Sequence, residues 1–277
     1  MLIYLGLFKN LILSMKLFNL LFFISLSLHA EAFTVGEVLK YEINLWKMTV
    51  GYSTMSVSGK TVVNGEECLV FETNAVGTPW INRFFKVDDR IKSIWNVQRK
   101  LPVYSEKKLH EGFYKRNHSV LFDLNKNTVH WEQNQYSGNT DKAGVKRDGA
   151  KWVEKEGDFA NLPNEFQDIL SAIYFQREYK SQVEIGKSFS IALFDDLKLT
   201  EMKIQILREE KLEVTINGVE KEINTIVVQP FIKTTGIFRS KGNIYIWISN
   251  DEKRMPIKIT ADLPLAGHVT VILKEVL

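Results

Sequence analysis

The sequence has few of the residues that bear chemistry or form covalent links in exported proteins. Its 277 residues include one cysteine, Cys68, so no intramolecular disulfide is possible. Cys68 is followed by Leu69, Val70 and Phe71, which predicts a buried thiol rather than a reactive one. Stability must therefore come from a hydrophobic core, and a chain of this size buries roughly 70–75% of its unfolded surface.

Histidine is scarce as well, and its positions give no metal site. None of the five has the spacing that builds one, such as two histidines one helical turn apart. They are His29, His110, His118, His130 and His268. We therefore expect no bound metal and no metal-dependent chemistry.

The common catalytic motifs are also missing. No G-x-S-x-G sequence is present. Gly186-Lys187-Ser188 resembles the end of a phosphate-binding loop, but Ser181 occupies the position where that loop requires glycine. The acidic pairs Asp88-Asp89 and Asp195-Asp196 would point to opposite faces of a strand and could not act together on one bond. We predict no catalytic residue, no cofactor and no enzymatic activity.

An excess of one charge sign is absent too. The chain carries 36 basic and 33 acidic side chains, a formal net charge of +3. Nucleic-acid binding needs basic residues gathered on one face, whereas the segment KRDGAKWVEKE alternates both signs. Nucleic acid is therefore not an expected partner, and we expect a monomer.

The N-terminus has the pattern of an export signal. Lys16 supplies one positive charge, residues 17–28 are apolar, and Ala30 and Ala32 form an A-x-A sequence before Phe33. This order is typical of a cleaved secretory signal peptide, which we assign to residues 1–32, with Met15 as an alternative start. We expect a periplasmic protein. The alternative is an uncleaved membrane anchor, because a span needs about 20 apolar residues and residues 1–28 are largely apolar.

Alternating apolar and polar residues recur along the rest of the chain and predict strands with one buried face. The apolar members include Leu39, Tyr41, Ile43 and Leu45, then Met202, Ile204 and Ile206, then Ile257, Ile259 and Ala261. Asn64-Gly65 and Asn217-Gly218 are strong hairpin signals, because both central residues of the favoured turn need positive φ. Strands joined by short turns predict an antiparallel meander.

One helix stands out among these strands. In NEFQDILSAIYFQREY, residues 164–179, apolar side chains recur with helical spacing after Asn164, a good N-cap. The segment NIYIWIS is apolar on both faces, so something must cover its second face. We predict a mainly β domain over residues 33–277: a strongly curved antiparallel sheet, an open or half barrel, with one helix on its concave face.

Residues 133–163 turn polar and lose any clear period. We interpret them as a long connection with a short hairpin at Asp148-Gly149. The same segment could instead separate two halves, residues 33–133 and 164–277.

Large apolar side chains suggest a cavity for a ligand. The segment TPWINRFFKVDDR could form a lip at the mouth of an apolar hollow, although the simpler interpretation is that it fills the core. Small-molecule cavities are concave and mostly apolar. The residues that we expect to line such a cavity are Trp80, Phe84, Phe85, Phe166, Ile169, Leu170, Ile173, Tyr245 and Trp247.

Five segments together resemble a known family. They are GEVLKYEINLWKMTVGYSTMSV, PVYSEKKLHEG, FQDILSAIYFQRE, GNIYIWISNDEKRMPIKI and GHVTVILKEV. In this order the chain is similar to DUF3108, a bacterial family of exported proteins of unknown function, over almost all of residues 33–277. The resemblance implies a curved, incompletely closed sheet like that of the half-barrel lipoprotein carriers of the envelope, which hold acyl chains. Those carriers hold two or more helices against the sheet, and here we predict one.

The polar residues within these segments have structural interpretations. Asp168 would bond the backbone near the helix start, and Asp251 would cap backbone donors in a tight turn, with Arg254 beside it. Arg177 suits the negative end of the helix. We assign structural roles to all four.

The functional hypothesis is a non-enzymatic envelope protein that binds or carries a hydrophobic ligand such as an acyl chain. The alternative is an envelope interaction or assembly protein with a fully packed interior that binds a protein partner through a sheet edge. The two differ in whether the helix roofs a cavity or fills it.

Overall fold

The structure is a computed structural model that describes residues 32–137, 151–178, 184–234, 237–239, 243–263 and 267–277. The expected signal peptide, apart from Ala32, and the expected hairpin at Asp148-Gly149 lie outside these residues. Residues Ala32–Leu277 form one compact unit. In the part of the chain that the structure describes, no helix is long and apolar enough to cross a membrane.

Strands make up most of this unit, and they form one antiparallel sheet. The first eight strands are β1 (Val38–Leu45), β2 (Met48–Val63), β3 (Glu66–Gly77), β4 (Asp88–Asn96), β5 (Leu101–Glu111), β6 (Tyr114–Asp123), β7 (Thr128–Ser137) and β8 (Lys151–Ala160). The others are β9 (Ser188–Asp195), β10 (Lys198–Ile216), β11 (Val219–Thr234), β12 (Ile237–Arg239), β13 (Ile244–Ser249), β14 (Pro256–Leu263) and β15 (Gly267–Val276). The helices are α2 (Pro79–Asn82) and α3 (Ile169–Glu178).

The sheet is built from two meanders that meet in its middle. The strand order is β8-β7-β6-β5-β4-β3-β2-β1-β15-β14-β13-β11-β10-β9, and β12 pairs with β11 alone. Leu39 of β1 lies opposite Val276 of β15, so the first and last strands join the two meanders. Residues 33–133 and 164–277 therefore contribute to one continuous sheet and do not form separate sheets.

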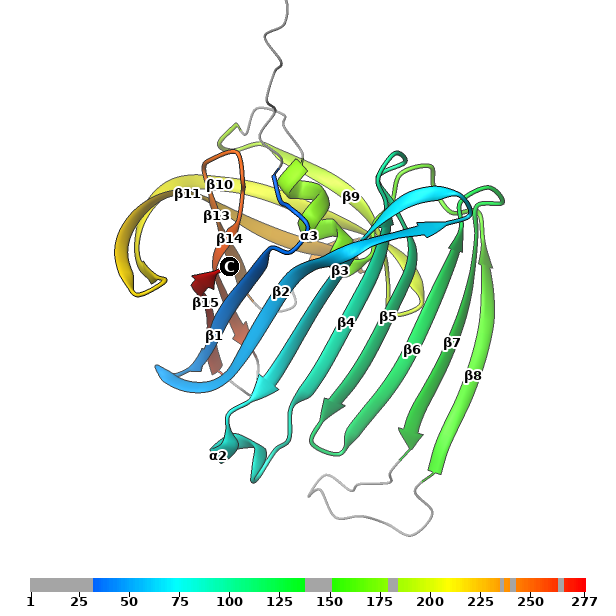
Figure 1. Cartoon of the computed structure of the whole chain (residues 1–277), viewed down its shortest axis with the longest axis horizontal. Coiled ribbons are helices and arrows are strands. Elements are labelled where there is room, and N and C mark those ends of the chain that lie inside the picture. Colours follow the sequence, from blue (N-terminus) through cyan, green and yellow to red (C-terminus); the bar gives the residue numbers. More distant parts are fainter. Residues whose placement is uncertain (1–31, 138–150, 179–183, 235–236, 240–242, 264–266) are drawn as a thin grey trace, which may run out of the picture. The chain divides into compact units, whose positions relative to one another are not determined.

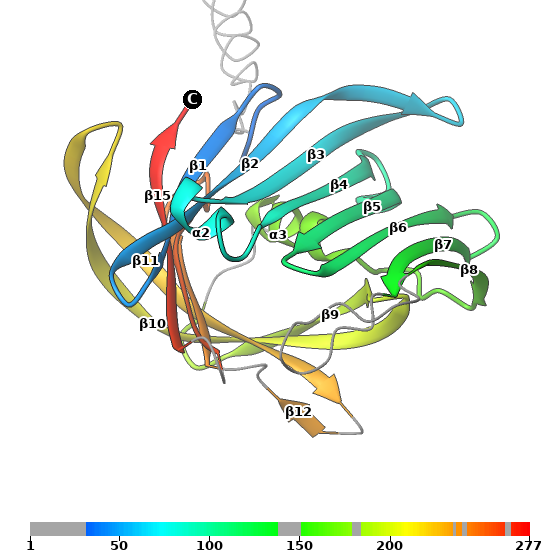
Figure 2. The ribbon, with the colours of Figure 1, turned by 90° about the horizontal axis from the view of Figure 1, so that it is seen from below.

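The sheet curls around α3 without closing into a barrel, which confirms the predicted fold class (Figures 1 and 2). The end strands β8 and β9 share no ladder in the described residues. Side chains bridge them instead: the ring of Phe194 in β9 contacts Phe122 of β6 and Phe159 of β8 at centroid distances of 5.5 and 5.8 Å. The hollow is thus closed on this side by aromatic packing and not by backbone hydrogen bonds.

The turns predicted from Asn-Gly pairs are confirmed. Asn64 and Gly65 join β2 to β3 with φ of 51° and 83°, and Asn217 and Gly218 join β10 to β11 with φ of 53° and 76°. These are the positive values that a two-residue hairpin turn needs. Cys68 is a buried free thiol, as its neighbours indicate, and burial raises its pKa.

The polar segment 133–163 is not the long connection that its composition suggests. β7 continues to Ser137, and β8 occupies Lys151–Ala160. In β8 the half-buried positions Val153, Gly157 and Phe159 alternate with exposed polar ones. The sequence does not show this alternation, because Lys155 and Gly157 occupy two of the positions on the inner face of β8, where apolar residues are expected. At Gly157 the ring of Trp131 occupies the space that a Cβ would need.

The helix begins later than the sequence predicts. Asn164 is not its N-cap. Gln167 is extended and pairs with β9: its N–H donates to the Ala192 carbonyl, and its own carbonyl accepts from the Phe194 N–H. Asp168 caps the helix, since its carboxylate accepts from the N–H groups of Leu170 and Ser171 at 2.8 and 2.9 Å. The free edge of β9 competes for the backbone before Asp168, and this tertiary pairing overrides the local capping signal.

The main core lies on one side of α3. Tyr174 stacks on Phe71 at 3.9 Å between ring centroids, and Phe33 packs edge-on against both rings. Next to this group, the buried guanidinium of Arg177 donates to Glu37 at 2.5 and 3.0 Å. Its remaining donors reach the carbonyls of Lys253 and Ala32. One side chain therefore connects the end of α3 to two distant parts of the chain, the segment before β1 and the β13–β14 turn.

We expect Arg177→Met to lower the free energy of unfolding by roughly 3–5 kcal/mol, because Glu37 is left buried and without its charge partner. Urea unfolding measures the change. Arg208→Met is the matched control: Arg208 pairs with Glu210 on the surface and should lose no more than about 1 kcal/mol. An Arg177→Met loss as small as that of the control would contradict the role assigned to this pair.

A second, partly buried cluster of polar side chains connects β5 and β6 of the first meander to the end of β9. Lys107 of β5 forms an ion pair with Asp195, and Arg116 of β6 forms one with Asp196, in the β9–β10 turn. His118 lies directly opposite Lys107 and is buried, and its Nδ1 has no hydrogen-bond partner among the described residues. Burial, together with the nearby charges of Arg116 and Lys107, lowers the pKa of His118 to about 4.

The protein should therefore lose stability in acid through His118. Because its pKa is near 6.5 in the unfolded chain and about 4 when folded, the unfolded chain binds more protons between these values. The free energy of unfolding should fall by roughly 3 kcal/mol as pH decreases from about 6.5 to about 4. We expect His118→Gln to remove most of this slope in urea unfolding at a series of pH values, and His130→Gln, on the surface, to keep it. A slope that persists in His118→Gln would refute the assignment.

Candidate functional site

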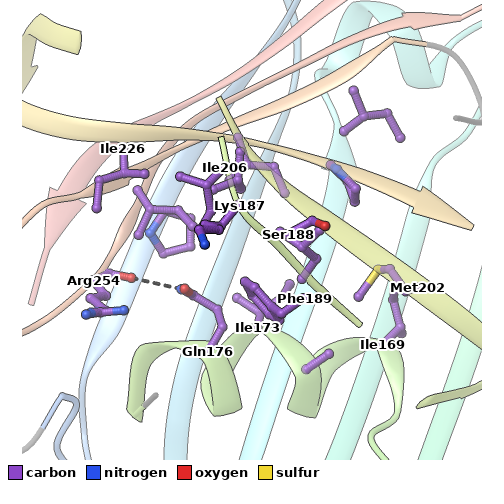
Figure 3. Close-up of a pocket in the computed structure, with 18 of the residues that line it drawn as sticks. Ile169, Ile173, Gln176, Lys187, Ser188, Phe189, Met202, Ile206, Ile226 and Arg254 are labelled. Atoms are coloured by element: carbon purple, nitrogen blue, oxygen red, sulfur yellow. Dashed lines mark hydrogen bonds between the residues drawn. The ribbon is translucent and has the colours of Figure 1, made fainter. Parts of the chain in front are cut away.

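An apolar pocket lies between α3 and the concave face of the second meander (Figure 3). Its volume is about 440 Å³, which falls within the range of roughly 300–1,000 Å³ typical of small-molecule sites. Its lining is Ile169, Ala172, Ile173, Gln176, Glu184, Lys187, Ser188, Phe189, Met202, Ile204, Ile206, Ile226, Val228, Pro230, Ile244, Ile246, Ile248, Arg254 and Pro256.

The helix supplies the roof of this pocket through one of its two apolar faces. Ile169, Ala172, Ile173 and Gln176 follow the spacing i, i+3, i+4, i+7, which places them on one stripe. A second stripe, which includes Leu170 and Tyr174, packs into the main core. One face of the helix packs in the main core and the other lines the pocket, which explains why both faces are largely apolar.

The floor consists of alternate residues from three strands. Ile244, Ile246 and Ile248 of β13 all face the pocket, as period-two alternation requires. β10 contributes Met202, Ile204 and Ile206, and β11 contributes Ile226, Val228 and Pro230. The floor is thus almost entirely aliphatic, and branched side chains on a rigid sheet give it a fixed shape.

Polar groups gather toward one side of the pocket. Figure 3 shows Arg254, Gln176 and Lys187 toward one side and Met202 and Ile169 toward the other. The Gln176 side chain donates to the Arg254 carbonyl at 3.2 Å. Partial burial lowers the pKa of the Arg254 guanidinium, which stays charged because its ordinary pKa is so high. The arrangement suits a molecule with a long apolar part and one polar end.

The described lining of the pocket carries few side chains that could donate or accept a proton near neutral pH. Of the described residues that line the pocket, Glu184 is the one carboxylate, and none is histidine or cysteine. Across the described ranges, no cluster of three or more histidine, cysteine, aspartate or glutamate side chains could hold a metal ion. Glu184 itself lies 3.7 Å from the ammonium of Lys187 and is exposed.

Of the nine side chains predicted to line a cavity, Ile169 and Ile173 line this pocket. Leu170, next to Ile169, belongs to the main core on the other face of the helix. Phe166 precedes the helix and packs with Phe122 and Phe194 in a separate cluster. The four cavity residues predicted in the helical segment 164–179 therefore lie in three different environments.

Tyr245 and Trp247 do not face the hollow, in contrast to the prediction. They alternate with the isoleucines of β13 and so point to the other face of the sheet. The Trp247 indole donates to Glu210 at 3.0 Å, and the Lys258 ammonium lies 4.6 Å from its ring centre. Long charged side chains, and not the helix, cover this face.

The three aromatic residues of the predicted lip lie elsewhere. Trp80 is part of α2, and Phe84 and Phe85 follow it in the β3–β4 connection. All three are exposed, and none lines the pocket. They do not fill the core either, contrary to the simpler interpretation.

The four polar residues have the contacts of structural groups. Asp168 is buried, caps α3 and accepts a hydrogen bond from the Ser93 hydroxyl at 2.5 Å, and burial raises its pKa. The carboxylate of Asp251 accepts from the N–H groups of Lys253 and Arg254 at 3.0 Å, which holds the β13–β14 turn. Arg254 differs from the other three, because it also lines the pocket.

Most of the lining was not identified from the sequence. The segment NIYIWIS places isoleucines on one face of β13 and aromatic residues on the other, and the prediction assigns the aromatic face to the cavity, whereas the structure assigns the isoleucines to it. The signal that could have found the lining is aliphatic alternation, which Ile204 and Ile206 share with Ile246 and Ile248.

A search of curated proteins finds no match to this chain. Among the solved structures similar to this chain is a β-barrel-like protein of domain of unknown function DUF1849 from Brucella abortus, with 9% sequence identity and a TM-score of 0.42; the match covers 87% of this chain and 96% of that one. A provisionally described exported protein with a YmcC-like fold from Bacteroides fragilis has 5% identity and a TM-score of 0.35, and a provisionally described lipoprotein from Parabacteroides distasonis has 9% identity and a TM-score of 0.33. Each of these two matches covers 88% of this chain and 96% of the other chain.

The family model described as "Protein of unknown function (DUF3108)" matches residues 40–274. This match spans the sheet from β1 to β15 and includes both α3 and the pocket beneath it. The chain belongs to the DUF3108 family.

Proposed function

We propose that this protein is an exported binding or carrier protein that holds a hydrophobic ligand such as an acyl chain beneath α3. One observation carries the proposal: the concave face is not filled by the helix but leaves an aliphatic pocket of about 440 Å³. An acyl chain matches a floor of isoleucines, because apolar contact is non-directional and roughly proportional to the area removed from water. The export pattern of residues 1–32 supports an envelope location.

The polar side of the pocket supports a ligand with an anionic end. Arg254 and Lys187 lie toward the same side as Gln176 (Figure 3). Guanidinium and ammonium groups form charge-assisted hydrogen bonds with carboxylates. A fatty acid would then lie with its carboxylate near Arg254 and its chain toward Met202.

The sheet edges give less support to a protein partner that adds a strand. On one edge, β8 carries Glu154, Lys155, Glu156 and Asp158, and charged residues discourage edge pairing. On the other edge, Gln167 already pairs with β9. The ligand proposal is therefore the stronger one.

We expect the wild-type protein to co-purify with a lipid-sized mass and to bind a fluorescent fatty acid. Native mass spectrometry of protein purified without detergent, followed by solvent extraction, measures the first. Titration of the delipidated protein measures the second. A bare mass together with no uptake of the fluorescent fatty acid would refute the proposal.

Filling the pocket should abolish uptake. Ile246→Trp adds bulk to the floor and should weaken binding of the fluorescent fatty acid at least about tenfold, since the added ring occupies the space that the ligand's apolar contacts require. Tyr245→Trp is the matched control: it is the neighbouring residue, on the opposite face of the same strand. We expect affinity within about twofold of wild type for this control. Equal affinities of the two variants would place the ligand elsewhere.

The anionic end can be tested separately. Arg254→Asn removes the guanidinium, and asparagine tolerates the φ of 44° at this position. We expect affinity for a fatty acid to fall about tenfold and affinity for the fatty alcohol of equal length to change little. Loss of both affinities to the same degree would mean that Arg254 acts through the shape of the turn.

A further inference from the structure

Aromatic side chains gather at one end of the sheet, away from the pocket. We define the aromatic rim as Trp46, Met48, Trp80, Phe84, Phe85 and Phe113, all of which are exposed. They come from the β1–β2 turn, from α2 and the residues after it, and from the β5–β6 turn. Figure 1 shows these three connections along the lower side of the sheet.

Specific contacts hold the three connections side by side. The Trp80 indole donates to the Thr49 carbonyl at 3.2 Å, which joins α2 to the start of β2. The Gly112 N–H donates to the Lys86 carbonyl at 2.7 Å, which joins the β3–β4 connection to the β5–β6 turn. Gly112 has a φ of 58°, and the ring of Phe85 lies where its Cβ would be. The rim is therefore one contiguous surface.

The β3–β4 connection has a defined conformation that presents its aromatic residues outward. The N–H groups of Phe84 and Phe85 both donate to the Ile81 carbonyl, at 2.9 and 2.8 Å. The Asn82 side chain donates to the Gly77 carbonyl and accepts from the Val87 N–H. Phe84 is 84% exposed and Trp46 is 67% exposed. Single exposed apolar residues are ordinary, but a contiguous group of aromatic residues marks an interaction surface.

Basic residues are interleaved with the rim. Lys47 follows Trp46, and Arg83 and Lys86 flank Phe84 and Phe85; all three cations are exposed. Lys115, the second residue of β6, is half-buried.

Acidic residues at the same end lie inside the strands, among them Asp262 of β14. Asp88 and Asp89 begin β4, and Glu111 ends β5. Asp88 and Asp89 are half-buried, Asp89 accepts the backbone N–H of His110 at 2.8 Å, and Glu111 is exposed. The three connections themselves, residues 46–47, 78–87 and 112–113, carry the cations Lys47, Arg83 and Lys86 and no carboxylate.

From this arrangement we infer that the aromatic rim docks on the surface of an anionic phospholipid bilayer. Tryptophan and phenylalanine bury their rings at the boundary between headgroups and acyl chains, and neighbouring lysine and arginine side chains bind the phosphates there. A rim of about six such residues gives reversible binding and does not span the bilayer. This inference does not depend on the proposed ligand, because the pocket and the rim share no residue.

The test is sedimentation with vesicles of phosphatidylcholine, with and without phosphatidylglycerol. The protein is produced from the full chain, and all variants share the N-terminus that the cell leaves, so differences between variants report on the rim. We expect wild type to bind the anionic vesicles more tightly and to lose this preference at high salt. Phe84→Ser should weaken binding at least about tenfold, and Arg83→Gln/Lys86→Gln about tenfold or more on anionic vesicles alone.

Val62→Ser is the matched control, since Val62 is 68% exposed near the opposite end of β2; it should bind as wild type does. Tryptophan emission gives a second readout: it should shift to shorter wavelength on binding, and Trp46→Phe/Trp80→Phe should remove most of that shift while vesicle binding persists. The inference is overturned if wild type binds neither vesicle, or if Phe84→Ser and Val62→Ser bind equally. Self-association that Phe84→Ser abolishes, without vesicle binding, would assign the rim to a second copy and also overturn it.

Discussion

The buried guanidinium of Arg177 fixes how α3 is rotated, and the character of the hollow depends on that rotation. Arg177 binds Glu37 just before β1, the carbonyl of Lys253 in the β13–β14 turn, and Ala32. A charged group buried this deeply is stable only where its hydrogen bonds are satisfied. Because these partners lie on one side of the helix, Tyr174 must face the core and Ile173 must face the pocket. If α3 were rotated by half a turn about its axis, the Arg177 guanidinium would lie over the isoleucines of the pocket floor.

The two ends of the sheet are joined by side chains and not by a backbone ladder. Phe166, Phe122 and Phe194 fill the space between β6 and β9, and the ion pairs of Lys107 and Arg116 lie beside them. A barrel closed by backbone pairing would have to draw β8 and β9 into one ladder and expel these rings. These three phenylalanine rings and α3 together occupy most of the hollow. The pocket is the part of the hollow that neither the rings nor the helix fills.

The sequence predicts the features that depend on neighbouring residues and misses those that depend on distant ones. The hairpins at Asn64-Gly65 and Asn217-Gly218 follow from local backbone geometry, and the curved sheet with one internal helix follows from alternation and helical spacing. The first residue of α3 cannot be predicted from local capping signals, because it depends on the pairing of Gln167 with β9. β8 cannot be recognised from its sequence, because its inner face includes Lys155 and Gly157 and so lacks an apolar period.

The same limit applies to the pocket. Alternation shows that Ile246 and Trp247 point in opposite directions, but not which of them faces the helix. That choice is set by how β13 pairs with β11 and β14, a matter of residues far apart in the chain. The large size of Tyr245 and Trp247 suggests that they line the cavity, but the sheet directs both side chains to its other face. There Lys258 and Glu210 contact Trp247. The exposed position of Phe84 likewise depends on a connection whose hydrogen bonds no local pattern indicates.

The pairing of β1 with β15 has a consequence for the order of events in folding. β1 is the first strand of the described sheet in chain order and β15 is the last, yet the two are neighbours in its middle. The pairing of Leu39 with Val276 therefore cannot form until β15 has been made. Contacts between such distant residues form slowly, because a very long loop has to close. Until β15 is available, the edge of β1 that pairs with it is empty, and the second meander has no strand to join. The two meanders of a nascent chain therefore become one sheet only after β15 has been made.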